Sequence, residues 1–177
     1  ENPKRFVSSV SGQPLFMGKI AVGNRKIGEL GLSFMGGVYN QFMNDGLQLD
    51  DKRSLYVFDI DFNTTLPKTG TIISGEWAWI HVQLPPDYSE QYGSRQQGGY
   101  TDIVQPILKK RMLGWNKAIL NLACRMEYVD WNRGRFKDTG TSIADDLWSI
   151  MPAISFRPTA QTDLRLKYRI LQQSDIL

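Results

Sequence analysis

Alternating apolar and polar residues recur along most of this chain, and this period limits its possible folds more than any other feature. Side chains two positions apart on a β-strand point to the same face, so the alternation predicts strands with one apolar and one polar side. Most of the segments have the length of about 9–11 residues that lets a tilted strand cross a bilayer. Helical periodicity is weak throughout, so we predict an all-β protein. The predicted strands are Leu15–Gly23, Ile27–Tyr39, Leu55–Asn63, Thr71–Val82, Gly99–Lys109, Ala118–Trp131, Leu147–Arg157 and Thr162–Leu171.

The connections between these strands alternate strictly between short and long. The short connections are Asn24–Lys26, Thr64–Gly70, Lys110–Lys117 and Pro158–Gln161. The long, polar connections are Asn40–Ser54, Gln83–Gly98 and Asn132–Asp146. An up-and-down barrel in an outer membrane has this order, because tight turns lie on its periplasmic rim and long loops on its extracellular rim. We therefore predict one antiparallel, up-and-down transmembrane β-barrel domain over residues 1–177, with about eight strands present.

Composition agrees with this fold without identifying it. The chain has 177 residues, 41% of them hydrophobic, and it lacks the run of about 18 apolar residues that a transmembrane helix needs. Barrel strands expose only every second residue to lipid, so a polar average does not argue against a barrel. The net charge of +3 is spread over strands and loops, which argues against binding to nucleic acid. Glu1–Arg5 do not form a signal peptide, so export would be directed by residues outside this sequence.

Charged residues fall mainly on the polar sides of the predicted strands. In Thr162–Leu171 three cations alternate with apolar residues. The basic residues expected to line a barrel lumen are Arg165, Lys167, Arg169, Arg125 and Lys19. The acidic residues expected on other parts of the wall are Asp59, Asp61, Glu76 and Glu127. A row of cations lowers the barrier for anions in a pore, and the acids would create a transverse field that limits this selectivity.

Large aromatic residues lie near strand ends or beside apolar stretches, where amphipathic rings suit the headgroup level of a membrane. These interface aromatics are Trp77, Trp79, Tyr128, Trp131, Trp148 and Tyr168. A soluble half-buried strand has the same alternation, so the rings have a second interpretation as core or carbohydrate-binding aromatics. Thr71–Val82 is the least regular segment, and its sequence leaves open which side faces outward.

Patterns for catalysis and metal binding are scarce. His81 is the only histidine and no Gly-x-Ser-x-Gly elbow occurs, so a nucleophilic triad has little to be built from. The single Cys124 excludes an internal disulfide and a multi-thiolate metal site. Asp59 and Asp61 share a face and could hold a cation, but lining a lumen is the simpler interpretation. We expect no enzymatic activity, no catalytic residue, no cofactor and no metal.

Several stretches carry a family resemblance. Arg125–Asn132, Trp148–Thr159 and Leu164–Arg169 resemble the C-terminal hairpins of bacterial outer-membrane porins, and most of all the phosphate-selective porin family. Gly28–Ser33 and Ser74–Trp79 are similar to that family's middle strands. The resemblance implies a barrel of about sixteen strands, often trimeric, that passes anions or small solutes by diffusion. The family's specificity loops have no clear counterpart here, so we carry over no phosphate-binding residue.

Two departures from a complete porin shape the expected function. The chain ends at Ser174–Leu177 without a terminal aromatic strand, and both ends would lie on the long-loop side. We therefore expect an internal portion of a larger barrel, while closure of eight strands on themselves stays open. The expected function is passive conduction of small solutes, with a preference for anions, in the outer membrane of a Gram-negative bacterium. Expected partners are outer-membrane lipids, small anions, and either further copies in a homotrimer or other envelope proteins.

Two other functions fit the same pattern. One is a barrel that does not conduct and serves as a structural or assembly subunit of an envelope complex. The other is a secreted β-sandwich that binds carbohydrate through exposed Trp and Tyr. The width of the lumen would distinguish the first, and dependence on detergent would distinguish the second.

Overall fold

The computed structural model describes residues 13–24, 26–44, 47–85, 93–136, 139–143 and 145–174. Within these ranges the protein is all-β, with no helix, which confirms the predicted class. The main strands are β1 (Leu15–Asn24), β2 (Gly28–Val38), β5 (Ser54–Thr65), β6 (Ile72–Val82), β7 (Arg95–Met112), β8 (Trp115–Asn132), β9 (Asp145–Arg157), β10 (Leu164–Lys167) and β11 (Ile170–Ser174). Two short strands, β3 (Met43–Asn44) and β4 (Leu47–Gln48), pair within the connection from β2 to β5.

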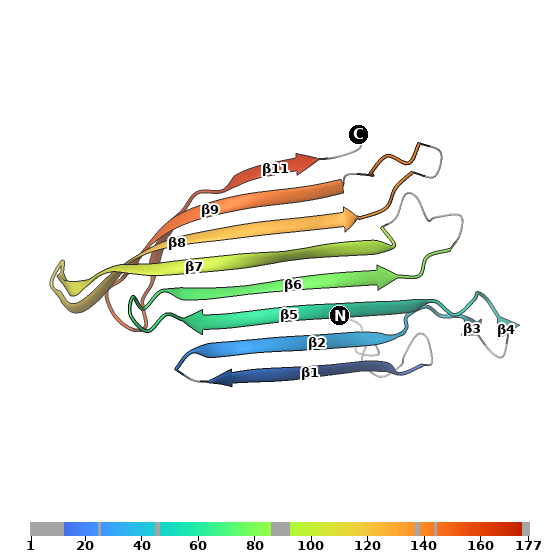
Figure 1. Ribbon diagram of the computed structural model, residues 1–177, viewed down its shortest axis with the longest axis horizontal. Coiled ribbons are helices and arrows are strands. Elements are labelled where there is room, and N and C mark those ends of the chain that lie inside the picture. Colours follow the sequence, from blue (N-terminus) through green and yellow to red (C-terminus); the bar gives the residue numbers. More distant parts are fainter. Residues whose placement is uncertain are drawn as a thin grey trace.

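The main strands form one antiparallel sheet in the order β1-β2-β5-β6-β7-β8-β9-β10, and β11 also pairs with β9 (Figure 1). From β1 to β10 each main strand pairs with the next one along the chain, so the predicted up-and-down order is confirmed, and β11 pairs with β9 beyond the end of β10. The sheet of nine strands is not closed: among the described residues, β1 pairs only with β2, and β10 and β11 pair only with β9.

Short and long connections lie at opposite ends of this sheet. The β1–β2, β5–β6 and β7–β8 turns gather at the left of Figure 1, and the β2–β5, β6–β7 and β8–β9 connections at the right. This is the separation that the alternation of loop lengths predicts. We refer to these two ends as the short-turn end and the long-loop end.

The last predicted strand, Thr162–Leu171, is divided into β10 and β11, although both follow one register on β9. Lys167 pairs with Ala153 and Ile170 with Ile150, so Tyr168 lies opposite Pro152. Tyr168 donates its backbone N–H to the Pro152 carbonyl at 3.1 Å. Proline has no N–H to donate in return, so one ladder bond is missing and the strand is interrupted there.

The β7–β8 hairpin is longer than predicted, because both strands run for 18 residues and meet at Leu113–Gly114. These two residues have φ values of 51° and 84°, which is the backbone of a tight two-residue hairpin turn. The register shifts after Pro106, where the missing N–H favours a bulge. The predicted connection Lys110–Lys117 is therefore mostly strand, and the hairpin extends past its neighbours at the short-turn end (Figure 1).

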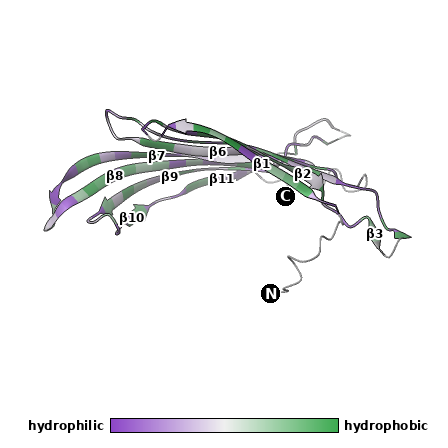
Figure 2. Ribbon diagram, turned by 90° about the horizontal axis from the view of Figure 1, so that it is seen from below, coloured by the Kyte–Doolittle hydropathy of each residue, from purple (hydrophilic) through white to green (hydrophobic). Residues whose placement is uncertain are grey.

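The main strands form a single curved layer, and no other described strand forms a second layer on either side of it (Figure 2). Among the described residues only Phe42, Ala118 and Ile143 are buried hydrophobic side chains. A water-soluble domain is normally built from two or more packed layers around one core. The function of this chain must therefore be sought on the two faces of the sheet.

Candidate functional site: the two faces of the sheet

Cross-strand register assigns every main strand to the same two faces. Side chains directly opposite each other on paired strands share a face. Leu32, Ile60 and Trp77 form one such row, and Ser33, Asp59 and Ala78 form the next. The register thereby decides the orientation of Thr71–Val82, which the sequence leaves open. Trp77 and Trp79 lie on the apolar face.

The apolar face is continuous from β1 to β11 and exposed. Leu166 is 77% exposed and Ile20 is 74% exposed. In the middle of the strands, Cys124 and tyrosine are the ionisable side chains of this face among the described residues. Its charged or titratable residues lie at the two ends: His81, Arg95, Asp130 and Asp146 at the long-loop end, and Lys110 on the β7–β8 hairpin. Its exposed large side chains are Phe16, Ile20, Val22, Leu30, Leu32, Phe34, Tyr56, Phe58, Trp79, Leu122, Met126, Ile154, Leu164, Leu166, Tyr168 and Ile170.

Aromatic rings form a girdle on the apolar face. Phe34 and Tyr56 have ring centroids 6.4 Å apart, and Phe58 and Trp79 have theirs 5.7 Å apart. Trp77 stacks on Tyr128 with centroids 5.8 Å apart and planes 8° from parallel. These two rings come from β6 and β8, which are separated by β7.

Gly99 on β7 makes the stacking of Trp77 and Tyr128 possible. It lies between the two residues in the cross-strand register. A Cβ at Gly99 would collide with the Glu76 carbonyl and lie 2.8 Å from the Trp77 ring. The missing side chain lets the two rings meet across the strand.

The other predicted interface aromatics lie at three different places. Trp148 continues the row of Tyr128, and its indole N–H donates to Gln172 at 3.1 Å. Tyr168 lies on the same face but opposite Pro152, away from the girdle. Trp131 falls at a bulge after Asp130, so strand alternation does not assign it to a face.

The polar face holds all nine residues predicted to line a lumen. Adjacent residues show how crowded this side is: Ser155 is 3% exposed, whereas Ile154 on the apolar face is 51% exposed. Lys19 on β1 reaches across β2 to Asp61 on β5, at 2.7 Å. Side chains on this face therefore contact each other across whole strands.

Arg125 is the centre of an ionic network that joins β7 and β8 to Arg169, which lies between β10 and β11. Its guanidinium forms two hydrogen bonds to Asp102, at 2.7 and 2.5 Å, and lies 4.4 Å from the centroid of the Tyr100 ring. It also lies 3.6 Å from Glu127, which accepts hydrogen bonds from Ser149 at 3.0 Å and Arg169 at 3.1 Å. A bidentate pair of this kind fixes both side chains in place.

The three cations of the last predicted strand differ in their pairing. Arg165 pairs with Asp163 at 2.9 Å, and Asp163 accepts a 2.5 Å hydrogen bond from Ser155. Arg169 pairs with Glu127. Lys167 makes no ion pair or hydrogen bond within the described part of the chain. Acidic partners therefore neutralise Arg165 and Arg169, whereas the Lys167 ammonium group has no such partner among the described residues.

Two hollows divide the polar face by charge. A hollow of about 390 Å³ is lined by Arg125, Arg157, Arg165 and Lys167 together with Asp102 and Asp163. A second, of about 330 Å³, is lined by Asp59, Asp61, Glu76 and Lys19. Among the described residues, no group of three or more potential ligands is placed to hold a metal ion. The acids thus gather over β5 and β6, and the cations over β8 to β10.

Sequence reasoning missed the acidic partners Asp102 and Asp163. Asp102 lies directly opposite Arg125 and pairs with it, but Gly98, Gly99 and Pro106 obscure the alternation of β7. Asp163 lies just before β10. The signal that could have found Asp102 is its position two residues after Tyr100, which places both on one face.

Comparison with known proteins gives no match to a family model, to a curated protein or to a solved structure. Within the described ranges, no helical segment has the length and hydrophobicity that crossing a membrane requires. The functional argument therefore depends on the two faces themselves.

Proposed function

We propose that this sheet is part of the wall of a transmembrane β-barrel in a bacterial outer membrane. In this proposal the apolar face contacts lipid and the polar face lines a water-filled lumen. The observation that carries it is the separation of the faces: large exposed apolar side chains cover one side of the main strands, more sparsely on β7, and the ionic networks occupy the other side. Barrel strands in membranes alternate in this way.

The energetics of a single layer support a lipid environment. Burying one Leu, Ile or Phe side chain stabilises a protein by about 1.5–3 kcal/mol, and the apolar face leaves many such side chains uncovered. A sandwich would cover them with a second sheet, and no described strand lies over this face. Bilayer hydrocarbon covers such a face without a second layer.

The two open edges of the sheet indicate that further strands complete the barrel. β1 on one side and β10–β11 on the other present unpaired backbone groups among the described residues, and open edges do not occur in the hydrocarbon region. We propose that further strands pair with both edges, in a barrel of about sixteen strands. The resemblance to phosphate-selective porins also suggests a trimer.

The proposed activity is passive diffusion of small solutes, with a moderate preference for anions. Lys167 supplies an unpaired charge in the cationic hollow, and weak contacts with such a group let an anion bind and leave. Asp102, Asp163 and Glu127 neutralise the neighbouring guanidinium groups. Strong selectivity is therefore not expected.

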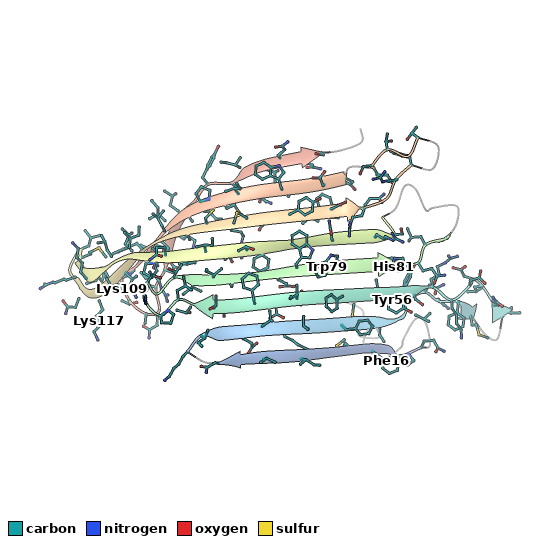
Figure 3. All side chains as sticks on the ribbon, in the orientation of Figure 1. Phe16, Tyr56, Trp79, His81, Lys109 and Lys117 are labelled. Carbon is teal, nitrogen blue, oxygen red and sulfur yellow. The ribbon has the colours of Figure 1, made fainter. Side chains whose placement is uncertain are left out.

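The test is a reversal potential across a planar bilayer with a salt gradient, measured on the protein and on Lys167→Gln. We expect the variant to shift toward cations, with a shift that shrinks at high salt, since charges are screened over about 3 Å at 1 M and about 30 Å at 0.01 M. Lys117→Gln is the matched control, because Lys117 lies on the overhanging hairpin (Figure 3).

Three outcomes would contradict this proposal in different ways. An unchanged potential in Lys167→Gln would remove that residue from the conducting path. Absence of conductance in the unmodified protein would favour a structural barrel subunit. A protein that stays monodisperse without detergent would favour a soluble sheet with a covered apolar face.

A further inference from the structure

A hollow of about 430 Å³ lies on the apolar face at its long-loop end. Its floor includes the aromatic side chains of Phe34, Phe58 and Trp79, and its rim includes Arg95 and Arg133. Figure 3 shows Tyr56, Trp79 and His81, which also line it, close together on β5 and β6. The hollow thus combines an apolar floor with a cationic rim.

The register explains how the rim is assembled. His81 on β6 lies directly opposite Arg95 on β7. The backbone N–H of Arg133, just after β8, donates to the Arg95 carbonyl at 2.9 Å. Three chain segments thereby bring two guanidinium groups and an imidazole to one edge of the hollow.

The guanidinium groups of Arg95 and Arg133 stand apart from the ion pairs of the described residues. Neither forms an ion pair or a hydrogen bond among the described residues, in contrast to Arg53, Arg125, Arg165 and Arg169. Asp130 and Asp146 lie on the same face of the neighbouring strands, but neither comes within ion-pair distance of the two arginines. Two unpaired guanidinium groups beside an apolar surface attract an anionic ligand.

The floor is suited to a hydrocarbon chain. Gly36 contributes no side chain, and a Cβ there would lie 2.8 Å from both the Phe34 and the Tyr56 rings. The rings therefore extend over the glycine. The row of Phe34, Phe58 and Trp79 lies nearer the middle of the sheet than the row of His81 and Arg95. The charged groups of the described residues therefore lie at the edge of the hollow and not on its floor.

We propose that this hollow binds a lipid with a phosphate headgroup. Its acyl chain would lie along Phe34, Phe58 and Trp79, and its phosphate would bind between Arg95 and Arg133. Arg is suited to this role because its planar fork matches phosphate oxygens in a bidentate geometry. The inference rests on the proposed function, because a lipid reaches this site only if the apolar face is in a membrane.

The experiment is native mass spectrometry of the protein in detergent, titrated with phosphatidic acid and, separately, with phosphatidylcholine of the same chains. We expect one phosphatidic acid to bind more tightly than phosphatidylcholine. Each cation near a membrane surface contributes roughly a fivefold gain in binding of an anionic lipid, so Arg95→Gln/Arg133→Gln should weaken phosphatidic acid binding about 25-fold. Because neither arginine side chain forms an ion pair or a hydrogen bond among the described residues, we expect the double variant to fold.

Arg157→Gln/Arg165→Gln is the matched control, because it removes the same charge from the polar face. It should change phosphatidic acid binding by less than about twofold, since the two faces are separated by the sheet. Equal losses in both double variants, or equal binding of the two lipids by the unmodified protein, would overturn the inference.

Flotation with phosphatidylcholine liposomes separates the two proposals. A protein that floats but does not prefer phosphatidic acid disproves the lipid site and leaves the membrane-embedded sheet standing. A protein that does not float disproves both.

Discussion

An arginine placed on either face of β2 tests the assignment of the faces most directly. Leu32 lies on the apolar face between Ile20 and Ile60, whereas the next residue, Ser33, lies between Lys19 and Asp59. Leu32→Arg and Ser33→Arg therefore add the same side chain at almost the same depth, on opposite sides of one strand. We expect the first to be costly and the second to be tolerated.

The depth of Leu32 follows from the length of its strand. β2 has 11 residues, of which Leu32 is the fifth and Ser33 the central one. At about 3.4 Å per residue and a tilt of about 40°, the strand spans about 28 Å along the membrane normal, close to the thickness of the apolar band of a barrel. Leu32 then lies about 3 Å from the midplane, where arginine on the lipid face costs about 2–4 kcal/mol.

The measurement is the free energy of unfolding in denaturant, with the protein folded in liposomes. Ser33→Arg should change it by about 0.5 kcal/mol or less, because the new guanidinium faces water and lies beside Asp59. A Leu32→Arg cost equal to that of Ser33→Arg would refute the lipid-facing assignment. A cost in Ser33→Arg alone would reverse the two faces.

Two further predictions concern the girdle and a loop. Gly99→Ala should destabilise the protein by about 1–3 kcal/mol, because the added carbon collides with the Glu76 carbonyl and the Trp77 ring. Tryptophan fluorescence should report the lost stacking of Trp77. The control Gly18→Ala should have little effect, because there is open space around Gly18. The β2–β5 connection should loosen in acid, because the Arg53 guanidinium beside Asp50 and the backbone N–H of Asp51 hold the pKa of the Asp50 carboxyl below its ordinary value. Because the pKa of Asp50 is lowered in the folded protein, the stabilisation from the Asp50–Arg53 pair is fully present above the ordinary carboxyl pKa of about 3.9. It is lost as the pH falls through the lower pKa that Asp50 has in the folded protein. Protection of the loop against hydrogen exchange, measured relative to the intrinsic exchange rate at each pH, should therefore be lost only in strong acid. A loss of protection between about pH 5 and 7, where an ordinary carboxyl is already ionised, would contradict the role of the Asp50–Arg53 pair.

The alternation along the chain was enough to predict most of the sheet. Each of the predicted segments contains strand, although Thr162–Leu171 is divided at Tyr168 and Arg169. The pattern of short and long connections predicted that each type lies at its own end of the sheet. Both are local properties: a period of two residues defines the faces of one strand, and loop length decides whether neighbours pair in sequence. The face of Leu166 or of Lys167 could therefore be predicted without knowledge of the rest of the molecule.

Cross-strand register decided what the sequence left open. In β6 both sides carry large or apolar residues, and only the pairing of Phe58 with Trp79 assigns the tryptophans to the apolar face. The register also pairs Arg125 with Asp102 and brings Arg169 to Glu127, which neutralises two of the predicted lumen cations. Residues 23 and 42 positions apart in the sequence meet there. A local period carries no information about such distant partners, because hydrogen bonding between strands fixes which residues lie opposite each other.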